Sequence, residues 1–116
     1  RGLDGRGLVR ASERLFAGEG PARIMAGMAT TIGVVATDAQ LTKAQANKLA
    51  TLAHHGLSRA IDPVTVNDGD TLFALATGTS GRSGDLSALG AMAAEAVARA
   101  IRNAVRAAAP AVAAAT

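Results

Sequence analysis

The chain has 116 residues, enough for one small domain, and 12 basic against 9 acidic side chains give a formal net charge of +3. These charges are dispersed and aromatic residues make up only 2% of the sequence, which argues against a nucleic-acid-binding protein. The sequence contains no cysteine, so disulfides and thiolate metal sites are excluded. Because it has neither a signal-peptide pattern nor an apolar run near the ~20 residues of a membrane helix, we expect a cytoplasmic protein without a membrane partner.

The apolar residues predict a thin core. Hydrophobic residues reach 49% of the chain, but alanine supplies many of them and the only aromatics are Phe16 and Phe73. Alanine buries little area at about 25 cal/mol per Å². We therefore expect the core to be completed by a partner subunit or by the remainder of a longer protein, and a first residue that is Arg1 rather than Met fits a fragment.

The first half of the chain reads as a linker, a strand and a helix. Residues 1–29 are punctuated by glycine and predict a linker with one short helix over Ser12–Ala17. The apolar, β-branched run Thr31–Thr37 predicts an interior strand. Thr42 with Gln45 three residues later matches a capping box, and the helix that starts there is expected to end at Asp62-Pro63.

The second half repeats this order of strand and helix. Val64–Val66 is expected to form a short strand or extended arm, and Thr71–Thr77 a second strand. Asp85 is expected to cap a long amphipathic helix, whereas the alanine-rich tail Ala107–Thr116 is expected to fray because Pro110 interrupts it. The chain is thus predicted to be an α/β unit whose sheet is incomplete.

Hydroxyl and carboxylate side chains lie just ahead of the two predicted strands. Thr30 and Thr31 open the first strand, while Asp68 and Asp70 precede the second. If the strands lie side by side, these groups converge. A hydroxyl nucleophile needs an acceptor for its proton and groups that fix its rotamer, so this pattern favours a hydrolase.

Four segments resemble one known family. They are Thr30–Ala39 (TTIGVVATDA), Leu41–Ala46 (LTKAQA), Ala53–Ile61 (AHHGLSRAI) and Asp68–Gly78 (DGDTLFALATG). Together they are similar to the self-cleaving aminopeptidase/amidase family that includes the L-aminopeptidase D-amidase/esterases, the β-aminopeptidases, the nylon-oligomer hydrolases and a pantetheine hydrolase. The resemblance is dense over residues 30–78 and looser through the last predicted helix.

The resemblance implies a fold and a domain organisation. Members form a four-layer αββα sandwich of the N-terminal-nucleophile type and are made as one precursor that cuts itself before a Ser or Thr. On this pattern residues 1–29 resemble the end of the α-subunit region, and residues 30–116 resemble the small β-subunit that carries the nucleophile. The missing α-region would complete the sandwich and supply the oxyanion-stabilising groups.

The resemblance also implies roles for individual residues. Thr30 would attack the carbonyl of Ala29 and, once water has cleaved the resulting ester, would carry a free α-amine with an ordinary pKa near 8 that can act as a base. Thr30 would then attack a substrate amide to give an acyl-enzyme. Asp68 and Asp70 match the family's acidic or Ser-Gly-acid pair, which orients the nucleophile. Thr31 is the weaker nucleophile candidate.

Two alternatives remain open at this point. Family members commonly carry Asn or Gly before the nucleophile, whereas this chain has Ala29, and an intact Ala29–Thr30 bond leaves Thr30 without a free amine. An uncut chain would act as a non-catalytic assembly domain, and transfer of the acyl group to an amine would resemble an ornithine acetyltransferase. The expected partners are the α-region of the same precursor, a small amide or peptide substrate and further copies of the protein; no metal or organic cofactor is indicated.

Overall fold

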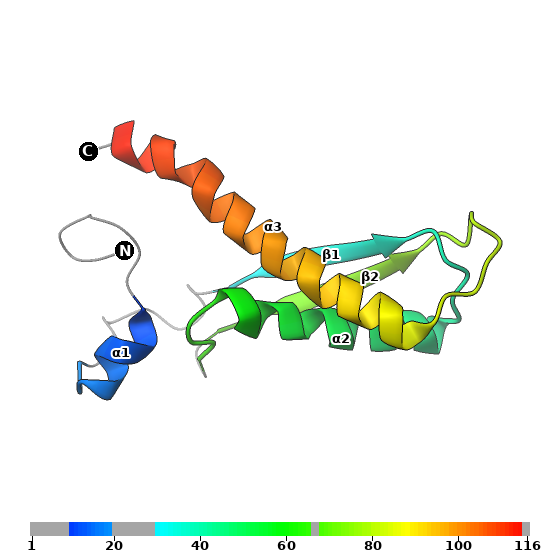
Figure 1. Cartoon of the computed structure of the whole chain (residues 1–116), viewed down its shortest axis with the longest axis horizontal. Coiled ribbons are helices and arrows are strands. Elements are labelled where there is room, and N and C mark those ends of the chain that lie inside the picture. Colours follow the sequence, from blue (N-terminus) through cyan, green and yellow to red (C-terminus); the bar gives the residue numbers. More distant parts are fainter. Residues whose placement is uncertain (1–9, 20–29, 66–67, 115–116) are drawn as a thin grey trace.

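A computed structural model describes residues 10–19, 30–65 and 68–114 of the chain. Its elements, in chain order, are α1 (Ala11–Phe16), β1 (Ile32–Thr37), α2 (Lys43–Ala60), β2 (Thr71–Ala76) and α3 (Leu86–Ala114). Figure 1 shows α2 and α3 packed together against the two strands, with α3 running obliquely across them.

The two strands form a parallel pair joined through α2. Ile32 lies opposite Thr71 and the register continues to Thr37 opposite Ala76. A parallel connection needs a crossover, and α2 provides it. The predicted α/β class is confirmed, and both predicted strands are present with slightly shorter bounds.

Side-chain caps set the start of both long helices. The Thr42 hydroxyl accepts a hydrogen bond from the backbone N–H of Gln45, whose side chain accepts one from the N–H of Thr42, so the predicted capping box is confirmed. The carboxylate of Asp85 likewise accepts hydrogen bonds from the first backbone N–H groups of α3, as predicted. α2 ends at Ala60, ahead of Asp62-Pro63.

One prediction about the irregular segments is wrong. α3 continues through Pro110 to Ala114 instead of fraying from Ala107, because the alanines around the proline have the highest helix propensity and offset part of its cost of about 3 kcal/mol. Of the two forms predicted for Val64–Val66, the strand is absent at Val64 and Thr65, which leaves the extended arm; residue 66 lies outside the described residues. None of the described helices has the length and apolar character required to cross a membrane.

The N-terminal helix α1 lies close to the predicted Ser12–Ala17 and attaches through polar contacts. Ser12 Oγ donates to Asp62 Oδ2 at 2.8 Å and Arg10 Nε donates to the same oxygen at 3.2 Å. None of the residues of α1 is buried. The contact places this part of residues 1–29 at the end of α2.

The core lies between one face of the sheet and the two long helices. It consists of small and medium apolar residues: Val35, Leu49, Ala53, Leu57, Ala93 and Val97. The helices approach each other closely because Gly56 of α2 has no side chain. A Cβ at this position would lie only 2.4 Å from the carbonyl oxygen of Ala94 in α3. Leu72 and Ala74 of β2 pack against the same cluster. We call this side of the sheet the covered face.

The opposite side of the sheet carries large apolar residues that no described element covers. Ile32, Val34, Phe73 and Leu75 are 72%, 65%, 56% and 55% exposed, and they alternate with the covered residues along both strands. We call these four residues the open face. Among the described residues, no element packs on it.

Candidate functional site

The site predicted from the sequence lies where β1 and β2 begin. Thr30 lies two residues before β1, and Asp68 to Asp70 immediately precede β2. The strands are parallel and in register, so these two segments meet at one end of the sheet. The backbone N–H of Thr71 donates to the carbonyl oxygen of Thr31 at 2.9 Å, which fixes the two segments side by side.

Gly69 seats the hydroxyl of Thr30. A Cβ on Gly69 would lie only 2.9 Å from Thr30 Oγ1, so the hydroxyl rests directly against the backbone of the turn. A side chain at residue 69 would need the space that the threonine hydroxyl occupies, so one of the two would have to shift. Thr30 itself is exposed, and within the described part of the chain its hydroxyl makes no hydrogen bond. The hydroxyl is therefore positioned by contact and open to an incoming group.

Asp70 holds the backbone that follows Thr30. Its Oδ1 accepts a hydrogen bond from the N–H of Thr31 at 2.8 Å, across 39 residues of sequence, and the contact is partly buried. A hydrogen bond between a carboxylate and an N–H is stronger than a neutral one. Asp70 therefore fixes the position of Thr30 through the next peptide unit.

Asp68 has a different partner from the one that the sequence predicts. Its carboxylate accepts from the backbone N–H of Thr65 and from the Thr65 hydroxyl, the latter at 3.1 Å. The Asp68 N–H donates in turn to the Thr65 carbonyl oxygen. These contacts close a local turn ahead of Gly69. Of the two predicted carboxylates, Asp70 bonds to the N–H of Thr31, next to Thr30, and Asp68 bonds to Thr65.

An exposed hydroxyl and a carboxylate that bonds to the neighbouring peptide N–H lie together at the strand ends. A hydroxyl and a carboxylate are groups that acyl transfer can use. Ala29, the other residue of the predicted cut, lies outside the described residues. The described residues contain no cluster of three or more His, Asp and Glu side chains able to hold a metal ion.

Sequence reasoning missed three parts of this site. The sequence indicated Gly69 only as a turn residue, because its contact with Thr30 leaves no local pattern. The hydrogen bond from the Thr31 N–H to Asp70 leaves no local pattern either. The contact between Thr65 and Asp68 did leave one, since a hydroxyl residue three positions before an acid commonly forms a side-chain to backbone turn.

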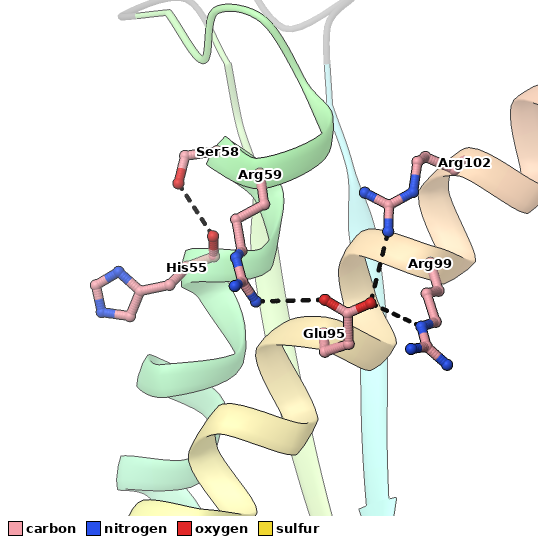
Figure 2. Close-up of polar contacts among 6 residues, drawn as sticks. All are labelled: His55, Ser58, Arg59, Glu95, Arg99 and Arg102. Carbon is pink, nitrogen blue, oxygen red and sulfur yellow. Dashed lines mark hydrogen bonds and ion pairs between the residues drawn. The ribbon is translucent and has the colours of Figure 1, made fainter.

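A second polar cluster lies on the helices, away from the strand ends. Figure 2 shows Glu95 of α3 between Arg59, Arg99 and Arg102, with its closest contact to Arg99 Nε at 2.7 Å. The hydrogen bond from Arg99, together with the positive charges of all three arginines, holds the pKa of Glu95 below its ordinary value of 4.5. All four side chains are exposed to solvent, so the cluster links α2 to α3 without forming a closed site.

Comparison with known proteins gives one family and a small set of relatives. The model of the family described as Peptidase family S58 matches residues 5–116. The uncharacterized aminopeptidase ML1167 of Mycobacterium leprae is 45% identical over 93 residues, which cover 68% of this chain and 26% of that protein. The uncharacterized aminopeptidase Rv1333 of Mycobacterium tuberculosis is 58% identical over 50 residues, 42% of this chain and 14% of that protein. No solved structure shows significant similarity. The matched region thus spans about a quarter or less of each relative.

Proposed function

Because the chain belongs to peptidase family S58, we propose that it is the nucleophile-bearing part of a self-cleaving amide or peptide hydrolase whose nucleophile is Thr30. The observation that carries this proposal is the seating of the Thr30 hydroxyl against Gly69, with Asp70 bound to the next peptide unit. A nucleophile at a strand end needs a fixed backbone and an accessible oxygen, and Thr30 has both.

The proposed reaction has two stages. In the precursor, Thr30 Oγ attacks the Ala29 carbonyl carbon, and the C–N bond breaks as the Thr30 nitrogen takes the hydroxyl proton and becomes a free amine. The acyl group is then held on Oγ as an ester, and water hydrolyses this ester to the carboxylate of residue 29 and the hydroxyl of Thr30. In the mature enzyme this amine accepts the proton of the Thr30 hydroxyl as Oγ attacks a substrate amide. The leaving amine takes a proton, and water hydrolyses the acyl-enzyme.

The rest of the enzyme would come from an α-region that ends in residues 1–29. The open face supports this proposal, because a second sheet packed on Ile32, Val34, Phe73 and Leu75, with its own helices behind it, would turn the present two layers into the αββα sandwich. The relatives are about four or more times longer than the segment matched, which leaves ample chain for the other layers. Their name, aminopeptidase, favours a small peptide or amide with a free amino end as the substrate.

The test begins with the intact mass and N-terminal sequence of the full-length precursor. We expect a fragment that begins Thr-Thr-Ile-Gly-Val. Thr30→Ala is expected to abolish the cut and to lower amide hydrolysis by about 10³-fold or more, because the attacking atom is lost. Thr30→Ser keeps a hydroxyl and serves as the matched control that is still cut. Hydrolysis at the wild-type rate by Thr30→Ala would show that another residue is the nucleophile.

Asp70→Asn tests the positioning role within the same experiment. The amide can still accept a hydrogen bond from Thr31 but carries no charge, so we expect slower cleavage with the fold retained. Asp68→Asn is the comparison, because Asp68 contacts Thr65. Equal losses in both variants would contradict a specific role for Asp70.

A non-catalytic assembly domain is the second candidate. Two observations favour it: the alanine at residue 29, where the family that the sequence resembles commonly has Asn or Gly, and the large open face, which fits a docking surface. A single uncut species with no amide hydrolysis, combined with stable assembly, would establish this reading.

A further inference from the structure

The two long helices carry most of the positive charge of the chain. Together α2 and α3 contain six basic side chains and one acidic side chain, a net charge of +5. The whole chain has a net charge of +3, so its other residues sum to −2. The single acid on these helices, Glu95, is already shared by Arg59, Arg99 and Arg102. The helical layer therefore carries a cationic excess of its own.

A groove runs between the same two helices, and we call it the outer groove. Its volume is about 490 Å³. None of its lining residues comes from β1 or β2, so it opens on the side of the helices that faces away from the sheet. Its floor is apolar, with Leu52 from α2 and with Gly90 and Ala91 from α3, whereas Lys48 and His55 of α2 line its edge. The outer groove thus combines an apolar floor with a cationic edge.

The outer groove leads toward the cluster around Glu95. Figure 1 shows α2 and α3 running in the same direction. On α2, Arg59 lies four residues beyond His55, which is about one helical turn on the same face. On α3, Glu95 lies four residues beyond Ala91. Figure 2 shows Arg59 from α2 and Arg102 from α3 reaching toward Glu95, so both helices contribute cations at this end.

We propose that the outer groove binds an acidic amphipathic helix of a protein partner. Small apolar side chains of that helix would fill the floor, and its Asp and Glu side chains would pair with Lys48 at one end and with Arg59 and Arg102 at the other. The path from Lys48 to Arg59 is about 17 Å along α2, so three turns of a partner helix are enough. The proposal does not depend on the reaction at Thr30.

The chemistry of the floor favours a helix over an extended peptide. A helix bonds its own backbone groups, whereas an extended peptide would bring N–H and C=O groups to a floor of apolar side chains such as Leu52 and Ala91. A nucleic acid would match the charge of the edge but would leave this apolar floor unfilled. An acidic helix satisfies both parts of the groove.

A second copy of the chain fits the outer groove poorly. Two copies that met at this groove would bring Lys48, Arg59 and Arg102 of each copy near the same cations of the other, which is unfavourable. The described helices offer no acidic face in exchange, because α1 has one Glu and one Arg, α2 has no acid and the Glu95 of α3 is already paired. The partner is therefore a different polypeptide.

Binding of a designed peptide to the full-length protein tests the proposal. The probe is a synthetic amphipathic helix with Leu and Ala on one face and Glu on both flanks, and its control has Lys in place of each Glu. By fluorescence anisotropy we expect a dissociation constant of about 10 µM for the acidic probe, weakened about 10-fold or more by added salt and by the change to Lys. No binding of the acidic probe, or equal affinity of the two peptides, would overturn the proposal.

Substitutions inside and outside the outer groove locate the binding. Ala91→Trp fills the floor and Lys48→Glu reverses a charge at the edge, while Ala107→Trp and Lys43→Glu make the same changes on exposed positions outside it. We expect the first pair to weaken binding of the acidic probe about 10-fold or more and the second pair about 2-fold or less. Thermal unfolding shows whether each variant is folded. Equal affinities of Lys48→Glu and Lys43→Glu would contradict a site in the groove.

Acetylation of the two lysines of α2 shows what occupies the outer groove. Lys43 and Lys48 are both exposed, but only Lys48 lines the groove. In the full-length protein alone both should react with acetic anhydride, and the acidic probe should slow Lys48 only. Lys48 that is unreactive without the probe would mean that the α-region covers the groove, and protection that grows with protein concentration would mean a second copy. Protection by a DNA duplex but not by the probe would mean a nucleic acid; each of these three results overturns the proposal.

Discussion

The two faces of the β1–β2 sheet are built from the same two strands but differ in what covers them. Val35, Leu72 and Ala74 on the covered face pack against α2 and α3, whereas Val34 and Phe73 on the open face meet solvent. The residues just named are apolar on both sides of the sheet. Sequence alternation thus marks which residues share a face, but only packing tells which face the chain can bury by itself.

The difference separates what the chain stabilises alone from what it offers to others. Burial of a side chain such as Leu or Phe contributes roughly 1.5–3 kcal/mol. On the covered face this contribution is already made. On the open face it becomes available only when another layer packs there, and an apolar surface of this kind is typical of an interface.

The largest expected effect is on the covered side. Leu57→Ala removes a side chain that is 1% exposed and leaves a cavity in the core, so we expect the free energy of unfolding to fall by about 2–5 kcal/mol. Urea denaturation followed by circular dichroism measures it. Leu75→Ala is the matched control, with the same change on the open face and an expected effect within about 0.5 kcal/mol. Equal losses would mean that the open face is covered in solution.

A smaller effect distinguishes the chain from the precursor. Phe73→Ser is expected to change the stability of the 116-residue chain little, since the ring is 56% exposed. In the precursor the same change should cost roughly 1–3 kcal/mol, because the ring would be buried by the second sheet. Thermal unfolding of both proteins and both variants gives the comparison. A cost that is the same in the two contexts would contradict the four-layer arrangement.

The smallest effect concerns the helices that build the covered side. The pKa of Glu95 is lowered in the folded chain, so its contribution is present above the ordinary carboxyl pKa and is lost as the pH falls through the lowered value. Glu95→Gln should therefore destabilise slightly at neutral pH, and its deficit should shrink toward pH 3 and with added salt. A deficit independent of pH would point to packing rather than charge.

Local signals in the sequence were enough to predict where the helices and strands lie. The long-range contacts between them could not be predicted in the same way. The capping box at Thr42 and the Asp85 cap act within a few residues, which is why both helix starts followed from the pattern. The continuation of α3 through Pro110 could be predicted only by weighing the cost of the proline against the helix propensity of the alanines around it. The convergence of Thr30 with Gly69 and Asp70 followed from strand order, but the separate partners of Asp68 and Asp70 depend on turn geometry that residue types alone do not encode.

The hydrogen bond between Asp70 and Thr31 has a consequence for maturation. A newly made chain end normally frays, because the first residues lose the restraint of the peptide bond before them. In a chain that begins at Thr30, the Thr31 N–H is the first peptide amide, and neither it nor the Asp70 carboxylate belongs to the bond that would be cut. The hydrogen bond is present in the uncut chain, and a cut before Thr30 would leave both of its partners in place. Cleavage would thus release a terminus that is anchored one residue in, leaving Thr30 able to change its protonation without leaving its place.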